Sequence, residues 1–216
     1  MQLIRRKASH WAYSSDSFVK AWRTQRMKNF LSLVKPPNRA RIIDLGGSPY
    51  MWQLIDHDFN VTLVNLPSKL PPTKRPSGFT FVEGDATNLS NLFEDKSFEI
   101  VYANSVIEHV GDEQKQAAFA AEVYRLANSY WVQTPSDRCP IEPTLVSHIT
   151  GNCLSGSCSL TPLVGKKLPA WKQFIDETRV LPKTRMSQLF PDGEIYVERK
   201  LIFEKSYSVY RPFQSS

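Results

Sequence analysis

Residues 41–50 read RIIDLGGSPY, an apolar run broken by one acid and followed by two glycines, a serine and a proline. The first five of these residues predict a buried strand. Gly46 and Gly47 let the backbone turn sharply and let a ligand approach without a Cβ in the way. Ser48 is a typical helix N-cap, and Pro49 suits the first helical position. The stretch therefore predicts a strand, a tight turn and a helix N-terminus, which favour a ligand site at the carboxyl end of the strand.

Apolar runs of strand length recur along the chain, separated by helical or irregular segments. Strands are predicted at Arg41–Leu45, Val61–Val64, Thr80–Val82, Glu99–Ala103, Tyr130–Gln133, Ile195–Arg199 and Ser206–Tyr210, with a turn near Glu204 and Lys205 between the last two. Helices are predicted at Pro49–Asp58 and Gln114–Leu126. Because strands alternate with helices, the pattern predicts an α/β fold with a parallel sheet covered on both faces.

The N-terminal part of the chain predicts a basic helix. The capping residues 14–16 precede apolar residues at helical spacing, and the pair Pro36 and Pro37 ends the helix after Val34. Nine Lys and Arg residues accompany a single acid in residues 1–40, whereas the rest of the chain holds 18 basic and 20 acidic residues. This local charge suits an anionic ligand or nucleic acid, or else forms a solvated helix face beside a near-neutral domain.

The composition excludes several protein classes. The chain has 216 residues, of which 41% are hydrophobic and 22% charged, as in ordinary soluble globular proteins. No apolar run reaches the ~18 residues needed to cross a bilayer, and the N-terminus lacks the apolar core of a secretory signal. Three cysteines, an odd number, argue against a disulfide framework and for a reducing compartment. We therefore expect a cytoplasmic protein without a membrane partner.

The glycine turn is not Gly-x-Gly-x-x-Gly, which speaks against a dinucleotide. It resembles motif I of class I S-adenosylmethionine-dependent methyltransferases of the type 11 kind, in which an acid-x-Gly-x-Gly turn holds the methionyl end of the cofactor. Further motifs of the family follow in the same order. They are the second strand ending at Asn65, the Gly-Asp turn at Asp85, the segment 98–110 that contains the fourth strand and the residues after it, and the strand followed by Thr134 and Pro135. The resemblance covers residues 41–135.

The resemblance implies both a fold and a cofactor. The fold is a Rossmann-like, doubly wound, mostly parallel seven-stranded sheet with an antiparallel C-terminal strand, preceded here by an N-terminal helical cap. The cofactor is S-adenosyl-L-methionine, which leaves as S-adenosyl-L-homocysteine. Asn65 stands where the family has an acid that takes the ribose hydroxyls, and Tyr50 stands where many members have a further glycine. Both are departures from the family pattern that bear on how the cofactor is held.

The family roles transfer to this chain position by position. Asp44 orients the turn, and the carbonyl groups of Gly46 and Asn104 face the methionyl amine. Asn65 binds the ribose, and Asp85 accepts from the adenine amino group. The implied cofactor-binding residues are Asp44, Gly46, Gly47, Ser48, Asn65, Leu66, Asp85, Ala86, Asn104 and Ser105.

Two catalytic residues are predicted after the fourth strand. His109 is the candidate general base and Glu108 would orient it, although the pair equally suits the start of the next helix, with His109 capping or packing. Glu142 and His148 are weaker candidates. Cys139, His148, Cys153 and Cys158 form the spacing C-x8-H-x4-C-x4-C, which allows zinc but matches no familiar zinc module. We therefore expect free cysteines and no metal.

The predicted organisation is an N-terminal cap helix over residues 1–37 and a methyltransferase domain over residues 38–216, with an irregular, lid-like insertion at about 136–183. The predicted function is methyl transfer by in-line displacement to a small-molecule acceptor held under the helix and lid. One alternative is an RNA or protein methyltransferase that uses the basic N-terminus, so a nucleic-acid partner is possible but not favoured. Another is a non-catalytic cofactor-binding subunit. The acceptor atom and the oligomeric state are not encoded in any motif.

Overall fold

One mixed sheet forms the centre of the protein. The computed structural model describes residues 18–67, 76–137, 178–200 and 202–214. The strands are β1 Arg41–Leu45, β2 Asn60–Asn65, β3 Phe79–Glu83, β4 Ile100–Asn104, β5 Ser129–Pro135, β6 Glu194–Lys200 and β7 Phe203–Arg211. Their order is β3-β2-β1-β4-β5-β7-β6. Strands β1 to β5 are parallel, and β7 is antiparallel to both β5 and β6. The seven-stranded sheet with its antiparallel C-terminal strand is confirmed.

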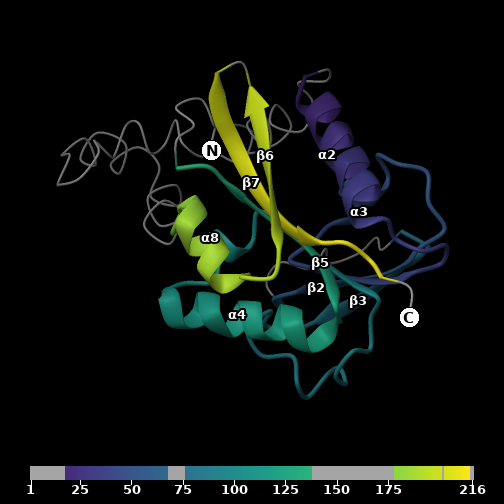
Figure 1. The fold of residues 1–216 in the computed structure, drawn as a ribbon. Helices are drawn as coiled ribbons and strands as arrows, with labels where there is room; N and C mark the ends of the chain where they lie inside the picture. The colour runs from purple at the N-terminus through teal and green to yellow at the C-terminus, as the bar shows by residue number, and fades with distance from the viewer. Residues whose placement is uncertain (1–17, 68–75, 138–177, 201, 215–216) are drawn as a thin grey trace, which may run out of the picture.

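Helices cover both faces of the sheet (Figure 1). They are α2 Phe18–Val34, α3 Pro49–Trp52, α4 Glu113–Leu126 and α8 Lys183–Leu189, with a 3₁₀ turn, η2, at Ile107–His109. Helices α2 and α3 lie on one face, and α4 and α8 lie on the other. The N-cap of α4 is Asp112, whose carboxylate accepts from the backbone N–H of Lys115 at 3.0 Å. The arrangement is the doubly wound α/β architecture that the alternation of strands and helices predicts.

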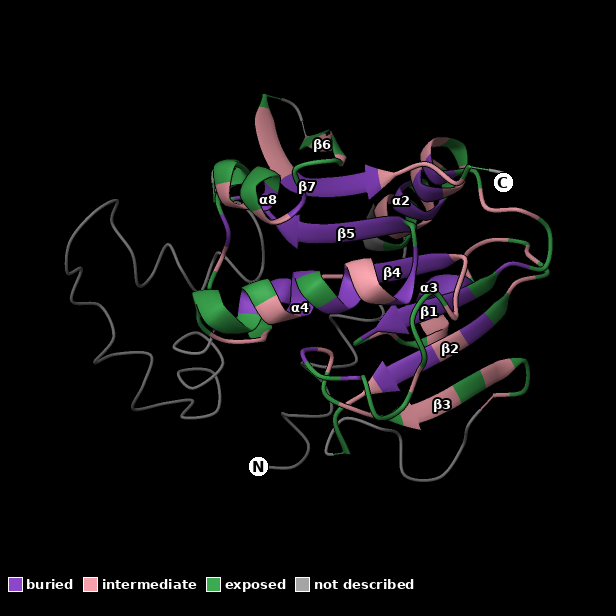
Figure 2. Cartoon of the chain, turned by 60° about the horizontal axis from the view of Figure 1, so that its bottom comes forward, coloured by how far each residue is buried: buried purple, intermediate pink, exposed green. Residues whose placement is uncertain are grey.

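Alternate residues of the central strands build two separate cores. In β1, Ile42 packs with the α2 side and Ile43 with the α4 side, because successive side chains of a strand point to opposite faces. On the α2 side, Phe30 makes edge-to-face contacts with the rings of Trp52, Tyr102 and Trp131. Strands β1, β4 and β5 are almost entirely buried, whereas the edge strand β3 is only half-buried (Figure 2).

The sheet has its topological switch point between β1 and β4. From β1 the chain runs outward to β2 and β3, then returns to the other side of β1 as β4. The register pairs Leu45 with Ala103, so the last residues of the two strands lie side by side. In open α/β sheets ligands bind in the crevice outside the carboxyl ends at this point. The predicted turn at residues 46–47 and the end of β4 at Asn104 therefore lie at the same edge of the sheet.

The helix predicted at Pro49–Asp58 is wrong in length, since α3 ends at Trp52. Beyond it, Leu54 and Ile55 close only i→i+3 backbone bonds. The ring of His57 then accepts from the backbone N–H of Phe59 at 3.2 Å. Polar side chains that bond nearby backbone groups compete with helical hydrogen bonds, which explains the early end.

The turn predicted near Glu204 and Lys205 is also wrong. Both residues lie inside β7, which pairs with β6 through a register shift between Glu198 and Arg199. Their charges are matched across the hairpin, Glu204 with Arg199 at 3.4 Å and Lys205 with Glu198 at 3.4 Å. The two charged residues resembled a turn in the sequence. In the folded hairpin they lie within a strand, because oppositely charged residues on β6 pair with them. The capping residues proposed for α2, residues 14–16, lie outside the described residues.

Candidate active site

The glycine turn after β1 is required by the packing of the protein's own side chains. Gly46 adopts φ 72°, and its N–H donates to the carbonyl of Val64 at 2.7 Å. A Cβ at Gly46 would lie 2.7 Å from a methyl of Val106, and a Cβ at Gly47 would lie 1.8 Å from Oδ2 of Asp44. Neither position tolerates a side chain, so both glycines are dictated locally, with or without a ligand.

Asp44 places a buried carboxyl group beneath this turn. The residue is 1% exposed, and its Oδ2 accepts from the indole N–H of Trp52 at 2.8 Å. Burial raises the pKa of Asp44 to about 8. Its Oδ1 is buried without a hydrogen-bond partner. A buried acceptor of this kind is satisfied by a cationic donor, so the turn fits a ligand that carries an ammonium group.

The residues that end β2 and follow β3 each leave one side-chain oxygen without a hydrogen bond among the described residues, although Oδ2 of Asp85 lies 3.9 Å from Nζ of Lys115. The amide of Asn65 donates to the carbonyl of Gly47 at 2.9 Å, which leaves its Oδ1 facing away as an acceptor. Asp85 is half-exposed, and its Oδ1 accepts from the N–H and the hydroxyl of Thr87 at 2.9 and 2.8 Å. Burial raises the pKa of Asp85, but these hydrogen bonds and the charge of Lys115 outweigh it, so that the net pKa is lowered. The carboxylate is therefore ionised at neutral pH.

Three further predicted cofactor residues flank these positions at the surface. Ser48 occupies the N-cap of α3, as predicted, but its hydroxyl makes no capping hydrogen bond. Leu66 is 48% exposed directly after β2, and Ala86 is half-buried directly after Asp85. Leu66 is therefore an exposed apolar side chain beside a polar edge of the sheet.

The end of β4 is held to β5 by a polar network. Asn104 is half-buried, and its Oδ1 accepts from the guanidinium of Arg26 at 2.8 Å. Ser105 adopts φ 57°, which is unusual for a residue other than glycine. Its N–H donates to the carbonyl of Gln133 at 3.0 Å, and its hydroxyl donates to Gln133 Oε1 at 2.9 Å. Asn104 and Ser105 thus lie at the switch-point edge, as predicted.

Arg26 is the residue at this edge that sequence analysis missed. It is 7% exposed, its Nε and Nη2 donate to Glu198 at 3.0 and 2.8 Å, and Nη2 also reaches the hydroxyl of Ser206 at 3.5 Å. One signal was available in the sequence. Arg26 lies four residues after Trp22 and four before Phe30, on the apolar face of a helix whose other basic residues point elsewhere.

The predicted catalytic pair lies in η2, not at the start of α4. The side chain of His109 is 30% exposed, and its Nδ1 lies 3.3 Å from the hydroxyl of Thr178. Glu108 is 1% exposed and accepts from the hydroxyl of Thr134 at 3.2 Å. Its other oxygen lies 4.0 Å from Nε2 of His109, beyond hydrogen-bond distance. The two side chains are adjacent, but the hydrogen bond of a base and its orienting acid is not formed.

Residues 44–129, from the glycine turn to the start of β5, match the family model of the methyltransferase domain. The matched segment, less than half of the chain, is similar to that methyltransferase domain. This match supports methyl transfer as the reaction and S-adenosylmethionine as the cofactor. The sequence matches none of the curated proteins.

Solved structures share the fold of the methyltransferase. An assigned S-adenosylmethionine-dependent methyltransferase from Methanococcus maripaludis has a TM-score of 0.56 and 12% identity, over 98% of this chain and 92% of its own. An assigned methyltransferase of an antibiotic biosynthesis pathway from Anabaena variabilis has a TM-score of 0.53 and 15% identity, over 81% and 64%. Phosphoethanolamine N-methyltransferase 2 of Haemonchus contortus, solved with S-adenosylmethionine, has a TM-score of 0.54 and 11% identity, over 87% and 52%. The methyltransferase thus spans less than two thirds of the last two.

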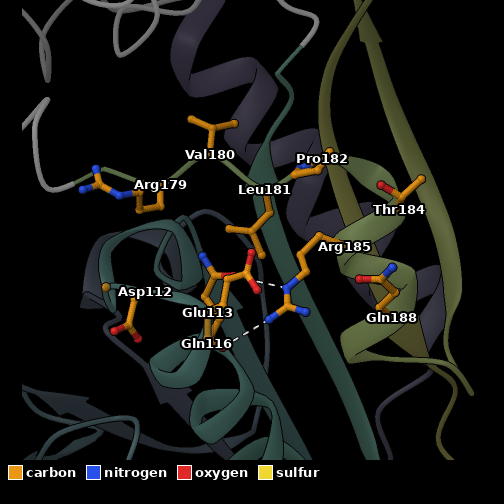
Figure 3. Close-up of a pocket in the computed structure, with 11 residues that line it drawn as sticks. Asp112, Glu113, Gln116, Arg179, Val180, Leu181, Pro182, Thr184, Arg185 and Gln188 are labelled. Atoms are coloured by element: carbon orange, nitrogen blue, oxygen red, sulfur yellow. Dashed lines mark hydrogen bonds between the residues drawn. The ribbon is translucent and has the colours of Figure 1, made fainter. Parts of the chain in front are cut away.

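A groove of about 530 Å³ opens beside the methyltransferase's η2 turn, between the start of α4 and the chain that leads into α8 (Figure 3). Arg185 closes its floor, donating to the carbonyl of Glu113 at 3.1 Å and to Gln116 at 3.5 Å. The backbone N–H of Arg179 donates to the carbonyl of Glu108 at 2.7 Å, which ties the groove's outer wall to η2. None of the ten predicted cofactor residues lines the groove, so it is distinct from the switch-point crevice.

Several predicted features lie outside the described residues. They are the candidates Glu142 and His148, the cysteines 139, 153 and 158, and most of the lid-like insertion at 136–183. Within the described ranges, no three His, Cys, Asp or Glu side chains gather as a metal site requires. In the same ranges, no helix combines the length and apolarity that crossing a bilayer requires.

Proposed function

We propose that the methyltransferase acts on a small-molecule acceptor at the carboxyl edge of β4 and β5, beneath the first turns of α2. The observation that carries this proposal is that two basic residues of the helix, Arg23 and Arg26, are engaged within the molecule. Arg26 is buried against Asn104, and the guanidinium of Arg23 lies 5.4 Å from the ring centroid of Tyr50 beside the glycine turn. The two guanidinium groups therefore flank the candidate site and contact other residues of the protein. Nucleic-acid binding would instead require basic side chains on an exposed surface.

The cofactor roles follow from the atoms that the packing leaves available. We assign Oδ1 of Asn65 to a ribose hydroxyl, because its amide nitrogen is committed to Gly47. We assign Oδ2 of Asp85 to the adenine amino group, because Thr87 occupies Oδ1. The buried Oδ1 of Asp44 and the turn at Gly46 suit the methionyl amine. When bound, the cofactor supplies an electrophilic methyl group on a sulfonium, and the chain supplies alignment and exclusion of water.

We further propose His109 as the proton acceptor for a protonated methyl acceptor. Its ring is partly exposed at the same edge of the sheet, and the hydroxyl of Thr178 beside Nδ1 would fix its tautomer. Glu108, buried against Thr134, lies beside His109 without a hydrogen bond between the two side chains. The odd number of cysteines, three, supports a cytoplasmic location. We keep the proposal that residues 1–37 form a cap over the acceptor and residues 136–183 a lid.

Calorimetric titration with S-adenosylmethionine and with S-adenosylhomocysteine tests the cofactor site. We expect micromolar binding of both, weakened at least about tenfold in Asp85→Ala, since a charge-assisted hydrogen bond is lost. Glu94→Ala is the matched control, because Glu94 is an exposed acid nine residues further along the chain. Failure of the wild-type protein to bind either compound would contradict the proposed site.

A further inference from the structure

Two amide side chains stand side by side where β4 and β5 end. Asn104 and Gln133 are register partners in these parallel strands. Both accept from the same nitrogen of Arg26, Asn104 Oδ1 at 2.8 Å and Gln133 Oε1 at 3.2 Å. Arginine is a donor only, so the amide oxygens must face it. The two NH₂ groups therefore point away from the guanidinium, and their orientation does not depend on an arbitrary choice of amide flip.

Arg26 is itself held from the other side. Glu198 takes two of its donors at 3.0 and 2.8 Å, and Lys205 approaches the second oxygen of Glu198 at 3.4 Å. The hydroxyl of Ser105 donates to Gln133 Oε1, which fills the second acceptor direction of that oxygen. The carbonyl oxygen of Gln133 thus accepts two hydrogen bonds inside the protein and that of Asn104 accepts one, so both oxygens are engaged while the donor ends remain.

The donor ends have no protein acceptor among the described residues. Gln133 is 1% exposed, and neither its Nε2 nor the Nδ2 of Asn104 donates to a described group. Among the described residues, only Asp44 Oδ1 and Trp131 Nε1 are buried side-chain polar atoms without a hydrogen-bond partner. The two amide nitrogens also lack a partner but do not belong to this buried set, so both reach the surface. Each amide is therefore held in one orientation and presents its NH₂ group at the surface as a donor that no described group uses.

The backbone next to the amide pair is strained. Ser105 follows Asn104 directly and takes φ 57°, a conformation that costs free energy in a residue other than glycine. Its N–H is paired with the carbonyl of Gln133 at 3.0 Å, so the strained turn locks β4 to β5 at the level of the two amides. Strain of this kind persists where a site must be held in one geometry.

We infer that Asn104 and Gln133 form a donor pair for an oxygen of the methyl acceptor, which is therefore a small molecule bearing a carboxylate or phenolate. This inference rests on the proposed function and names its substrate class. Two neutral N–H donors bind an anionic oxygen without giving it a proton, which leaves the oxygen's electron pair available. Arg26 is a positioning residue, since it acts on the acceptor only through the two amides.

The test follows the side-chain amide resonances of the full chain, labelled with ¹⁵N and saturated with S-adenosylhomocysteine. The probes are benzoate and 4-nitrophenolate. We expect both probes to shift the Asn104 and Gln133 NH₂ signals saturably, with one dissociation constant for the two residues. The amide of Asn60 serves as the internal control, because it donates to the carbonyl of Arg39 at the opposite edge of the sheet.

Asn104→Asp and Gln133→Glu keep the oxygen that faces Arg26 and replace only the NH₂ group. Each should remove one pair of signals, which assigns it, and weaken benzoate binding at least fivefold. Arg26→Lys should move both NH₂ signals before any probe is added and weaken benzoate binding, because one ammonium cannot hold two amides and Glu198 together.

The outcomes separate this inference from the function on which it rests. If S-adenosylhomocysteine binds but both probes leave the two NH₂ signals as still as those of Asn60, the donor pair is overturned and the methyltransferase site stands. If S-adenosylhomocysteine itself fails to bind, both proposals are overturned. An Arg26→Lys protein with unmoved NH₂ signals removes the positioning role alone.

Discussion

At the scale of single residues, Asp44 shows how the glycine turn and the candidate cofactor site depend on each other. Its carboxyl group fills the space that a side chain at Gly47 would need, and Trp52 supplies its hydrogen-bond donor from within the core. The second oxygen is left unpaired in a buried position. The free protein therefore keeps an acidic group that is costly to ionise and that a cationic ligand would stabilise.

We predict that Asp44→Asn stabilises the free protein at neutral pH. The pKa of Asp44 is about 8 in the folded state against 3.8 in the unfolded chain. Between these pH values unfolding releases a proton from Asp44. The contribution of protonated Asp44 to the free energy of unfolding is therefore fully present below pH 3.8 and is lost as the pH rises toward 8. The asparagine does not titrate, and should gain up to about 4 kcal/mol on the wild type between pH 4 and pH 7. Urea unfolding at the two pH values measures the gain. A gain that is the same at both would show that Asp44 ionises freely in the fold.

We also predict that cofactor binding releases a proton near Asp44 at pH 7. An ammonium donor beside the buried oxygen favours the ionised carboxylate, which lowers the pKa of Asp44 through neutral pH. Calorimetric titration with S-adenosylhomocysteine in buffers of different ionisation enthalpy counts the proton. Asp44→Asn is the control and should show no release from this site. Binding without a proton release would place the amine of the cofactor away from Asp44.

At the scale of elements, α2 is a layer of the domain. Met27, Phe30 and Val34 are fully buried against the sheet, and the N–H of Phe213 donates to the carbonyl of Val34 at 2.7 Å. The helix carries Arg26 to the carboxyl edge of β4 and β5 while its apolar face covers the sheet. A single helix thus contributes both to the core and to one wall of the candidate site.

Phe30→Ala tests this structural role. The ring is fully buried and contacts three other aromatic rings, so its removal should cost about 3 to 5 kcal/mol of the free energy of unfolding. Lys28→Ala is the control on the exposed side of the same helix and should change stability by less than about 0.5 kcal/mol. Chemical denaturation followed by circular dichroism measures both. Equal, small effects would mean that α2 is only loosely attached.

At the scale of the whole molecule, one sheet couples two cores. The same strands present Ile42 to the α2 side and Ile43 to the α4 side, so disruption of either face disturbs the backbone that supports the other. The C-terminal hairpin completes the sheet, because β7 pairs with β5 over six residues from Tyr130 to Pro135. Parts of the chain that lie far apart in sequence thus share one cooperative structure.

We predict a single unfolding transition for the described domain. Phe30→Ala and Phe119→Ala remove buried rings from opposite faces of the sheet, and each should lower the midpoint of the same transition. Two of the five tryptophans, Trp52 and Trp131, lie in the α2-side core and contribute to the fluorescence signal, while far-ultraviolet circular dichroism reports on the whole backbone. Coincident curves are expected. Separated curves would indicate that the two faces unfold independently.

The sequence by itself determined the strands, the glycine turn, the seven-stranded topology implied by the family motifs, and the edge at which the site lies. The strands and the turn depend on local information, namely apolar periodicity and turn residues that act within a few positions, whereas the topology came from the resemblance to the family. The two structural errors, the long helix at Pro49–Asp58 and the turn at 204–205, occurred where side-chain hydrogen bonds or cross-strand pairs decide the backbone.

Only the tertiary structure decided how the polar side chains at that edge are used. Arg26 meets Asn104 across 78 positions, Gln133 across 107 and Glu198 across 172. The amide NH₂ of Asn65 is likewise oriented by a partner far along the chain, since it donates to the carbonyl of Gly47. Local patterns predict which residues approach the edge, but the direction of a hydrogen bond depends on partners that only the folded chain brings together.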